Sequence, residues 1–457
     1  MKTNPEIFKA YDIRGIYGQD LNGETAYILG QAYVELRRKD GKTGELNIVV
    51  AEDMRLSSPQ LKLSLVKGLT DAGANVVDIG LASTPSFYFA VANYGYDGGI
   101  IVSASHNPAE WNGFKLVRER ALPVSGESGI YFLRDKVIEG NFKSAKITGK
   151  IFKKRDVLKD QINHDLQFAD LAKIKPLKIV VDPANGMGAQ YIEELFKHLP
   201  CELIKMNFKL DGTFPAHEAD PIKEENLIYL QKTVMKEKAD LGIAIDGDGD
   251  RIFFVDNNGE AINQAITRGV LAMIFLREKP GAKICYDIRP GRITRDLIEE
   301  NGGIPIVTRV GHSLIKEQAI KEGAYFAGES SGHFFLNTEL GCFEVPVIII
   351  LKLLQEFSQS GKTVAEFIAP YKKYYHSGEI NSVVENKEEV FAKIEKMYKD
   401  GEANKLDGIT IEYPDFWFNV RGSNTELKLR LNLEAKTKEI MEEKRDEVLK
   451  IINSCTK

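Results

Sequence analysis

The chain has 457 residues, of which 43% are hydrophobic and 28% charged, and this composition predicts a soluble globular protein with several domains. Its net charge of −5 argues against nucleic acid or an anionic membrane as a partner. Four scattered cysteines without a C-x-x-C pair predict neither a disulfide framework nor a zinc site. The sequence starts without an apolar signal segment, and the most apolar run, 345–351, ends at Lys352, so we expect a cytoplasmic protein without a membrane span.

Strand-like apolar runs alternate with helical patterns as far as residue 369. Such alternation predicts mainly parallel sheets covered by helices on both faces. Because the alternation recurs in three blocks, we expect three similar α/β domains with mixed or parallel sheets, over residues 1–150, 151–256 and 257–369. The predicted strands are 47–51, 75–79, 99–103, 177–181, 202–206, 241–245, 283–287, 304–308 and 324–327, with helical patterns at 60–72 and 85–92.

The remaining residues, 370–457, have a different pattern. Short strands and two charged helices predict an α+β domain, which makes a fourth domain of the chain. Its predicted strands are 379–384, 408–413, 417–419 and 427–433, and its predicted helices are 387–399 and 436–452.

The segment Asp246–Arg251 reads Asp-Gly-Asp-Gly-Asp-Arg and follows the apolar run 241–245 directly. Three carboxylates this close repel one another unless a hard cation lies between them, so the segment predicts a divalent metal site. Arg251 beside them is a potential partner for a phosphate or carboxylate. A solvated turn is the alternative, which the apolar runs on both sides disfavour. An EF-hand is a poor match, because Arg251 stands where that loop requires glycine and Asn257 where it requires glutamate.

A second polar segment, Ser103–Pro108, also follows an apolar strand and places Ser105 at a strand end, where α/β proteins bind ligands. It lacks the G-x-S-x-G pattern of serine hydrolases, which disfavours acyl transfer. A serine oxygen or its phosphate ester could complete the oxygen shell of a nearby cation. Lys115, a little further along, is a candidate proton donor or phosphate partner, with an ordinary surface lysine as the alternative.

Three further segments carry polar side chains that suit sugar phosphates, although each alone could be an ordinary turn. Gly328–His333 offers a carboxylate, hydroxyls and a histidine for a hydroxyl-rich ligand. Arg421–Thr425 offers a guanidinium and hydroxyls for a phosphate. Gly311–Ser313 precedes a helical pattern, where it could bind an anion or simply cap the helix.

With these segments in this order, the sequence resembles the α-D-phosphohexomutase superfamily over essentially its whole length, and in particular its phosphomannomutase/phosphoglucomutase branch. The segments Tyr11–Gly15 and Asp211–Pro215 also look like motifs of that family. The resemblance implies four domains around one central active-site cleft. It further implies hexose phosphates as substrates, Mg²⁺, a hexose 1,6-bisphosphate as activator, and a monomer or homodimer.

The resemblance also implies a role for individual residues. Ser105 would be the phosphorylated serine, with Mg²⁺ held by its phosphate and by Asp246, Asp248 and Asp250. The implied reaction moves a phosphoryl group between O1 and O6 of a hexose through a bisphosphorylated sugar. Lys115 and His333 are both candidates for the general base, and His106 would orient its neighbours. The implied binding residues are Glu329 and Ser331 for sugar hydroxyls, Arg421, Ser423, Asn424 and Thr425 for the phosphate that is not transferred, and Tyr11, Arg14, Arg251, His312 and His333 around the cleft.

The chain departs from the usual pattern of the family at three positions. Ser330 replaces the usual methionine or glutamine, Leu427 the usual proline and Arg289 a common lysine. The first departure leaves the preferred sugar open. A phosphoglucosamine mutase is the alternative within the class, but Asn424 stands where those enzymes usually have glycine. A non-catalytic sugar-phosphate-binding homologue would be expected to lack Ser105 or a metal aspartate, and the chain has all four.

Overall fold

The computed structural model describes residues 3–142, 145–289, 291–384, 386–422 and 428–455. Contacts between residues group the chain into two compact units, each of which is described by itself. Unit 1 comprises Met1–Ile262, His312–Ala327 and Ser331–Phe367, and unit 2 comprises Asn263–Gly311, Gly328–Ser330 and Ile368–Lys457.

Unit 1 contains a six-stranded mixed sheet with the strand order β1-β5-β4-β2-β3-β6. Strands β4, β2, β3 and β6 run parallel, whereas β5 pairs antiparallel with both β4 and β1. Strands β1, β5 and β6 were not among the predicted ones. The bounds are β1 (Ile13–Ile16), β2 (Asn47–Glu52), β3 (Asn75–Leu81), β4 (Gly98–Val102), β5 (Trp111–Arg118) and β6 (Ile151–Lys153).

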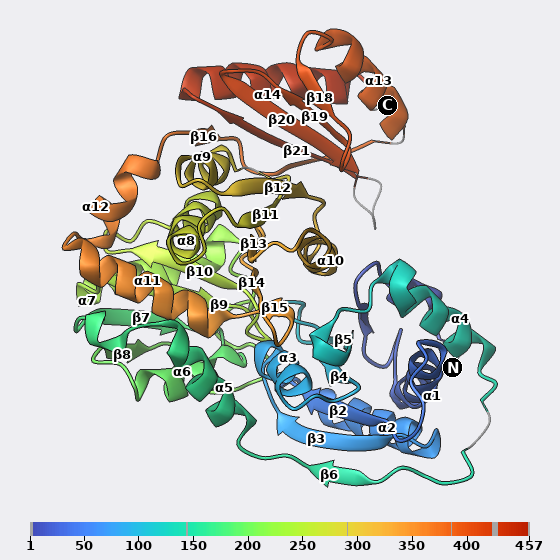
Figure 1. The fold of residues 1–457 in the computed structure, drawn as a ribbon. Helices are drawn as coiled ribbons and strands as arrows, with labels where there is room; N and C mark the ends of the chain where they lie inside the picture. Colours follow the sequence, from blue (N-terminus) through green and yellow to red (C-terminus); the bar gives the residue numbers. More distant parts are fainter. Residues whose placement is uncertain (1–2, 143–144, 290, 385, 423–427, 456–457) are drawn as a thin grey trace. The chain divides into compact units, whose positions relative to one another are not determined.

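Helices cover both faces of this sheet, as the alternation predicts (Figure 1). Ile48 and Val50 of β2 pack in one apolar cluster with residues of α1 (Gly23–Lys39), α2 (Ser58–Asp71) and α4 (Tyr131–Glu139). On the opposite face Gly99 lies against the side chains of α3 (Thr84–Asn93). Ser83 caps α3 by accepting a hydrogen bond from the backbone of Ser86, and this fixes where α3 starts.

A second, four-stranded sheet of unit 1 has the order β10-β9-β7-β8. Its strands are parallel except β10, which pairs antiparallel with β9, so that the residues between them form a hairpin loop. The bounds are β7 (Lys178–Asp182), β8 (Glu202–Lys205), β9 (Leu241–Ile245), β10 (Ile252–Asp256), α5 (Val157–Asp165), α6 (Gly188–Phe196) and α7 (Ile228–Glu237).

The later residues of unit 1 include the antiparallel pair β14 and β15. The apolar run 345–351 consists of the N-cap residue Val345 and the first residues of α11, and all of them are buried. Across the part of the chain that the structure describes, every helix is too short or too polar to cross a membrane. The bounds are α10 (His312–Glu322), β14 (Phe334–Asn337), β15 (Cys342–Glu344) and α11 (Pro346–Ser360), while β13 (Phe326–Gly328) and α12 (Val364–Ile368) span the limits of the two units.

Unit 2 combines a parallel strand pair with an antiparallel sheet. Strands β11 and β12 pair in parallel, and β16-β21-β20-β19-β18 form the second sheet, with β17 also paired to β21. The α+β pattern predicted for the C-terminal residues is thereby confirmed. The bounds are α8 (Gln264–Glu278), β11 (Lys283–Asp287), α9 (Arg292–Glu300), β12 (Ile304–Thr308), β16 (Tyr375–His376), β17 (Ile380–Val383), α13 (Lys387–Met397), β18 (Glu402–Asn404), β19 (Ile409–Glu412), β20 (Phe416–Gly422), β21 (Lys428–Ala435) and α14 (Lys438–Asn453).

The crossing of α1 and α2 depends on glycine, and this generates a test of the fold. A Cβ on Gly68 would collide with the backbone carbonyl of Tyr27, and one on Gly30 would come within 2.7 Å of the carbonyl oxygen of Leu65. Because backbone cannot move aside as a side chain can, we expect Gly68→Ala to lower the free energy of unfolding by about 1–3 kcal/mol in urea denaturation. Lys67→Ala, on the exposed side of α2, is the control and should change it by less than about 0.5 kcal/mol. Equal effects of the two substitutions would contradict the packing.

Candidate active site

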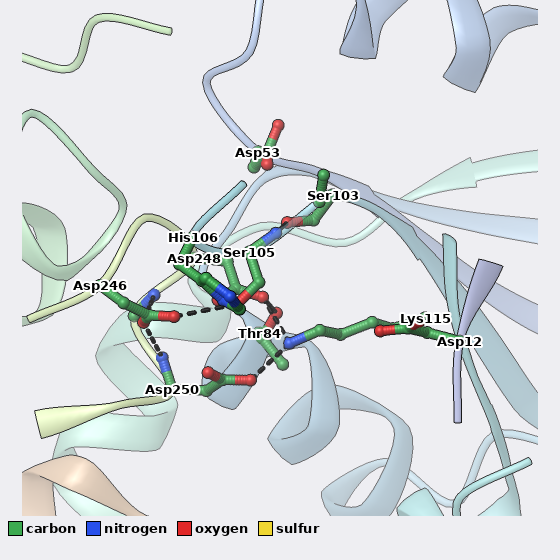
Figure 2. A network of polar contacts seen from close by, with 12 residues as sticks. Asp12, Asp53, Thr84, Ser103, Ser105, His106, Lys115, Asp246, Asp248 and Asp250 are labelled. Carbon is green, nitrogen blue, oxygen red and sulfur yellow. Dashed lines mark hydrogen bonds and ion pairs between the residues drawn. The ribbon is translucent and has the colours of Figure 1, made fainter. Parts of the chain in front are cut away.

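Three segments that are distant in sequence meet at one polar cluster in unit 1 (Figure 2). The loop after β4 carries Ser105, strand β5 carries Lys115, and the β9–β10 hairpin carries the three aspartates. Hydrogen bonds join the hydroxyl of Ser105 to Asp246 and the ammonium group of Lys115 to Asp248. The serine loop and the aspartate loop, which the sequence predicts separately, therefore form one site.

Ser105 is 1% exposed and has an unusual backbone conformation. Its φ of 53° lies in the left-handed region, which side-chain-bearing residues rarely adopt. Its Oγ lies 2.9 Å from Asp246 Oδ2 and 3.3 Å from Nδ1 of His106, and its backbone N–H donates to Ser103 Oγ at 3.0 Å. The hydroxyl is thus aimed at the aspartate loop by a specific backbone conformation.

The aspartate loop is folded around the side chain of Asp246. One of its carboxylate oxygens accepts the backbone N–H groups of Gly249, Asp250 and Arg251, each at 3.1 Å. Gly249 has a φ of 81°, as this tight loop requires. Gly247 lies against the carbonyl oxygen of Ser105, where a Cβ would come within 2.5 Å. The two glycines therefore permit the loop to turn and to approach the serine closely.

The residues present fit a divalent cation. Oxygen atoms of Asp246, Asp248 and Asp250 lie within 4.8 Å of one another, and all three side chains are buried. Within the described residues, Asp248 Oδ1 is buried and accepts no hydrogen bond. Hard cations prefer carboxylate oxygens, and a buried acceptor without a donor is costly unless a cation completes its contacts.

The charges of the cluster are balanced in part by Lys115. Burial and the charges of Asp250 and Asp248 raise the pKa of Asp246 well above its ordinary value. The Lys115 Nζ lies 2.6 Å from Asp248 Oδ2 and also contacts Asp250. Burial alone would lower the pKa of Lys115, but the charges of Asp248 and Asp250 raise it, so that this lysine holds its proton. Lys115 contacts two of the three buried carboxylates, and the third, Asp246, has Arg251 Nε at 3.9 Å.

Two residues at the cluster were assigned no role from the sequence. Thr84, at the start of α3, donates from Oγ1 to Asp248 Oδ2 at 2.5 Å, and its backbone N–H donates to the Asp248 carbonyl at 2.9 Å. Asp12 holds Arg14, whose Nε lies 2.7 Å from Asp12 Oδ2. Asp12 lies in the Tyr11–Gly15 motif, whereas Thr84 belongs to no motif that the sequence suggests. The only signal for Thr84 is the Ser-Thr-Pro start of a helix, which is common in proteins.

Arg14 and Arg251 differ in how their guanidinium donors are used. Arg14 donates to Asn107 Oδ1 at 2.6 Å and to the Ala104 carbonyl at 3.3 Å, so it braces the loop. Arg251 is 9% exposed, and among the described residues its Nε and Nη1 atoms have no hydrogen-bond partner. Its nearest carboxylate oxygens belong to Asp220, at 3.8 Å, and Asp246, at 3.9 Å. A buried guanidinium with unused donors is suited to an anionic ligand.

Three histidines of unit 1 lie near the cluster. His333 Nε2 is 3.2 Å from Asp250 Oδ1, and His333 Nδ1 is 2.8 Å from Ser331 Oγ. His312 stacks on His333 and meets the ring of Tyr11 edge-on. Burial and then the charge of Lys316 lower the pKa of His312 well below its ordinary value. Burial and then Arg251 lower the pKa of His106 in the same direction.

A buried ion pair behind these histidines is a second feature that the sequence does not reveal. Lys316 Nζ lies 3.2 and 3.1 Å from the two carboxylate oxygens of Glu344, and both side chains are fully buried. A Glu344 oxygen also lies within 4.8 Å of ligand atoms of Asp250 and His333. The lysine and glutamate are 28 residues apart on α10 and β15, so no local pattern links them.

Unit 2 contains Glu329 and, with it, Ser330 and Arg289, which depart from the family pattern. Glu329 accepts the Gly311 N–H at 2.9 Å and lies 3.2 Å from Arg289 Nη2. Asp287 accepts hydrogen bonds from the hydroxyl of Ser330 at 2.9 Å and from Nε of Arg289 at 2.5 Å. Ser330 and Arg289 are therefore anchored on the same buried carboxylate.

Arg421, also in unit 2, lies on β20 and is 6% exposed. Its Nη2 donates to Glu379 Oε2 at 2.9 Å. Burial would raise the pKa of Glu379, but Arg421 and Arg289 lower it, so the carboxylate is charged. The other predicted phosphate-binding residues, Ser423, Asn424 and Thr425, lie outside the described residues.

The site combines a buried serine hydroxyl, clustered carboxylates that fit a divalent cation, and a guanidinium group with unused donors. This combination is typical of a metal-dependent phosphotransferase. Comparison with known families agrees with this class. Family models of phosphoglucomutase/phosphomannomutase match four consecutive regions of the chain. They are alpha/beta/alpha domain I at residues 5–134, domain II at 158–259, domain III at 266–374 and the C-terminal domain at 379–451.

Full-length relatives point to the same family. A phosphomannomutase from Escherichia coli is 40% identical over 98% of this chain and 100% of its own, and one from Methanocaldococcus jannaschii is 39% identical over 98% and 97%. The crystal structure of a phosphoglucomutase/phosphomannomutase family protein from Burkholderia thailandensis, 31% identical, superimposes with a TM-score of 0.90 over 99% and 98% of the chains. The chain belongs to the phosphoglucomutase/phosphomannomutase family, with its four-domain α/β architecture and mixed sheets.

Thr84 offers a test of the metal site that does not depend on activity. Thr84→Val keeps the shape of the side chain but removes the hydrogen bond to Asp248, so we expect the protein to bind Mn²⁺ about tenfold more weakly in a calorimetric titration. Thr294→Val, which also removes a buried threonine hydroxyl but in unit 2, is the control and should leave the affinity unchanged. An unaltered affinity in Thr84→Val would show that this contact does not orient a metal ligand.

Proposed function

We propose that the protein interconverts hexose 1-phosphate and hexose 6-phosphate, with mannose and/or glucose as the sugar. The reaction passes through a phosphoserine enzyme and a hexose 1,6-bisphosphate intermediate. The observation that carries this proposal is the hydroxyl of Ser105, which is buried, held in a strained backbone conformation and placed 2.9 Å from Asp246 of the aspartate cluster. The names of the full-length relatives, phosphomannomutases and phosphohexose mutases, support the same reaction.

Mg²⁺ is the proposed metal, held by Asp246, Asp248, Asp250 and an oxygen of the Ser105 phosphate. When bound, it offsets negative charge on the phosphoryl group. Arg251 binds the phosphate or the sugar that carries it, through the donors that no other described residue uses. Because catalysis of phosphoryl transfer consists mainly of positioning and electrostatic stabilisation, these residues supply most of what the reaction needs.

Proton transfer is assigned to Lys115 and His333, the two candidates from the sequence. Lys115 keeps its proton because Asp248 and Asp250 raise its pKa, and this suits a group that donates a proton to the leaving hydroxyl of the sugar or serine. His333 is oriented by Ser331 on one ring nitrogen and Asp250 on the other, an arrangement that suits a base. His106, beside the Ser105 hydroxyl, is an orienting neutral partner.

Substrate binding is assigned to the remaining predicted residues. Glu329 and Ser331 accept and donate hydrogen bonds to sugar hydroxyls, and Tyr11, Arg14 and His312 line the binding site. The phosphate that is not transferred is bound by Arg421, Ser423, Asn424 and Thr425.

We also propose the domain limits 1–150, 151–256, 257–369 and 370–457, a hexose 1,6-bisphosphate as activator, a cytoplasmic location, and a monomer or homodimer.

A mutase assay tests the proposal directly. Purified protein with Mg²⁺ and a trace of glucose 1,6-bisphosphate is expected to convert mannose 1-phosphate and glucose 1-phosphate to the 6-phosphates, and to turn over glucosamine phosphate at least tenfold more slowly. The products are measured by coupled dehydrogenase assays and ³¹P NMR. Preference for glucosamine phosphate would favour the alternative mutase, and no turnover on any of the three would contradict the enzyme assignment.

The nucleophile is checked in the same preparation. Intact-mass analysis should show one phosphoryl adduct on the wild-type protein after incubation with glucose 1,6-bisphosphate, and none on Ser105→Ala. Ser358→Ala provides the matched control, because it removes another buried serine hydroxyl of unit 1, which accepts the N–H of Lys175 and, among the described residues, makes no hydrogen bond with the cluster. An adduct that persists in Ser105→Ala would place the phosphoryl group on another residue.

A further inference from the structure

Arg55 is a fully buried arginine whose guanidinium group donates hydrogen bonds to backbone carbonyl oxygens. Its Nη1 donates to the carbonyl oxygens of Pro108 and Trp111, at 2.7 and 3.0 Å. Its Nη2 donates to the carbonyl oxygens of Ser105 and Asn107, at 2.8 and 2.6 Å. A single guanidinium group therefore holds four backbone carbonyls of the segment that begins at Ser105.

The position of Arg55 is fixed from within its own domain by a buried polar network. Asp53 lies 3.3 Å from Arg55 Nε and accepts the hydroxyl of Ser58 at 2.6 Å. Asp53 also interacts with Ser103, and the Ser103 hydroxyl in turn accepts the N–H of Ser105 (Figure 2). The network thus holds the Ser105 residue at both its N–H and its carbonyl oxygen.

The segment Asp211–Pro215, for which the reaction proposed above has no use, covers Arg55 from the neighbouring part of unit 1. The ring of Phe214 lies over the guanidinium, with 5.0 Å from the ring centroid to Cζ of Arg55. Gly212 packs so closely that a Cβ would come within 2.6 Å of the Arg55 Cα and of the Met54 carbonyl oxygen. The segment therefore packs on both the guanidinium group and the backbone of Arg55, and restricts the movement of this residue.

We propose that Arg55, held by Asp53 and covered by the Asp211–Pro215 segment, is a positioning residue that maintains the left-handed backbone of Ser105 and aims its hydroxyl at Asp246. Non-glycine residues avoid this conformation unless the surroundings enforce it, and the four hydrogen bonds of Arg55 supply that enforcement. The expected effect on kcat rests on the proposed function. The expected effect on the backbone conformation of Ser105 does not depend on that function.

The test replaces Arg55 by lysine, which keeps the charge beside Asp53 but cannot reach four carbonyls in the fork geometry of a guanidinium. Arg37→Lys is the matched control, because Arg37 is an equally buried arginine of unit 1 that binds the Asp97 carbonyl, Asp40 and Glu119 instead. We expect Arg55→Lys to lower kcat roughly 10- to 100-fold with KM for the hexose phosphate within about twofold. Arg37→Lys should lose as much thermal stability while keeping kcat within about twofold of wild type.

Hydrogen–deuterium exchange provides a readout that does not require activity. Peptides covering residues 103–112 should exchange at least tenfold faster in Arg55→Lys than in wild type or Arg37→Lys, and other peptides of the first sheet should exchange alike in all three. If the wild-type protein showed no mutase activity, the exchange measurement would still test whether Arg55 holds residues 103–112. A failure of the proposed function can therefore be distinguished from a failure of the positioning role. Unchanged exchange in Arg55→Lys, or a kcat no lower than that of Arg37→Lys, would overturn the proposal.

Gly212→Ala tests the same role of Arg55 through the segment that covers it. This variant keeps the proposal testable if Arg55→Lys does not fold. Its new methyl group would press on the backbone of Arg55 without touching the hydrogen bonds of Ser105. The proposal predicts the same pattern, a lower kcat, a KM within about twofold and faster exchange at residues 103–112. Wild-type exchange and kcat in a folded Gly212→Ala protein would show that the covering segment does not position the loop.

Discussion

The structure depends on one electrostatic constraint, the burial of three carboxylates within a few ångströms of one another. Ionised groups in such a place are costly unless opposite charge compensates them, and burial together with Asp250 and Asp248 raises the pKa of Asp246 accordingly. Lys115 compensates in part, through its contacts with Asp248 and Asp250. Asp248 Oδ1 is buried and accepts no hydrogen bond within the described residues, so the carboxylates that are costly to bury also offer an oxygen to a divalent cation.

The scaffold meets this constraint by rigid placement of backbone. The aspartate loop is a hairpin between two buried strands and is folded around one carboxylate. The serine loop is held at the carbonyl oxygen of Ala104 by Arg14 and at that of Ser105 by Arg55. Phosphoryl transfer needs positioned oxygen atoms and fixed charges more than it needs covalent chemistry from the protein. Two arginines donate to backbone carbonyl oxygens of the serine loop. This is consistent with a site whose activity depends on the backbone conformation of Ser105 as well as on its side chain.

The sequence was sufficient for the features that are contiguous along the chain. The aspartate segment, the serine loop and strands such as β9, β11 and β12 could be predicted because their signals lie within a few residues of one another. Strands β1 and β5 could not, since β5 interrupts the parallel pattern as an antiparallel strand and β1 is a four-residue strand at the edge of the sheet. Thr84, Arg55 and Glu344 escaped prediction for a different reason, because each acts on a partner 28 to 164 residues away that only the fold brings near. The phosphate-binding residues Ser423, Asn424 and Thr425 stay a prediction.

The central claim is that the three aspartates and Ser105 form one cation site. Anomalous diffraction at the manganese edge, from crystals of the phosphorylated protein grown with Mn²⁺, tests it most directly. The account predicts a single strong peak ligated by Asp246, Asp248, Asp250 and an oxygen on Ser105. A different buried group, Asp250 with His333 and Glu344, could also hold a metal by its spacing. A peak at that group alone, or no ordered manganese at saturating concentration, would contradict the account.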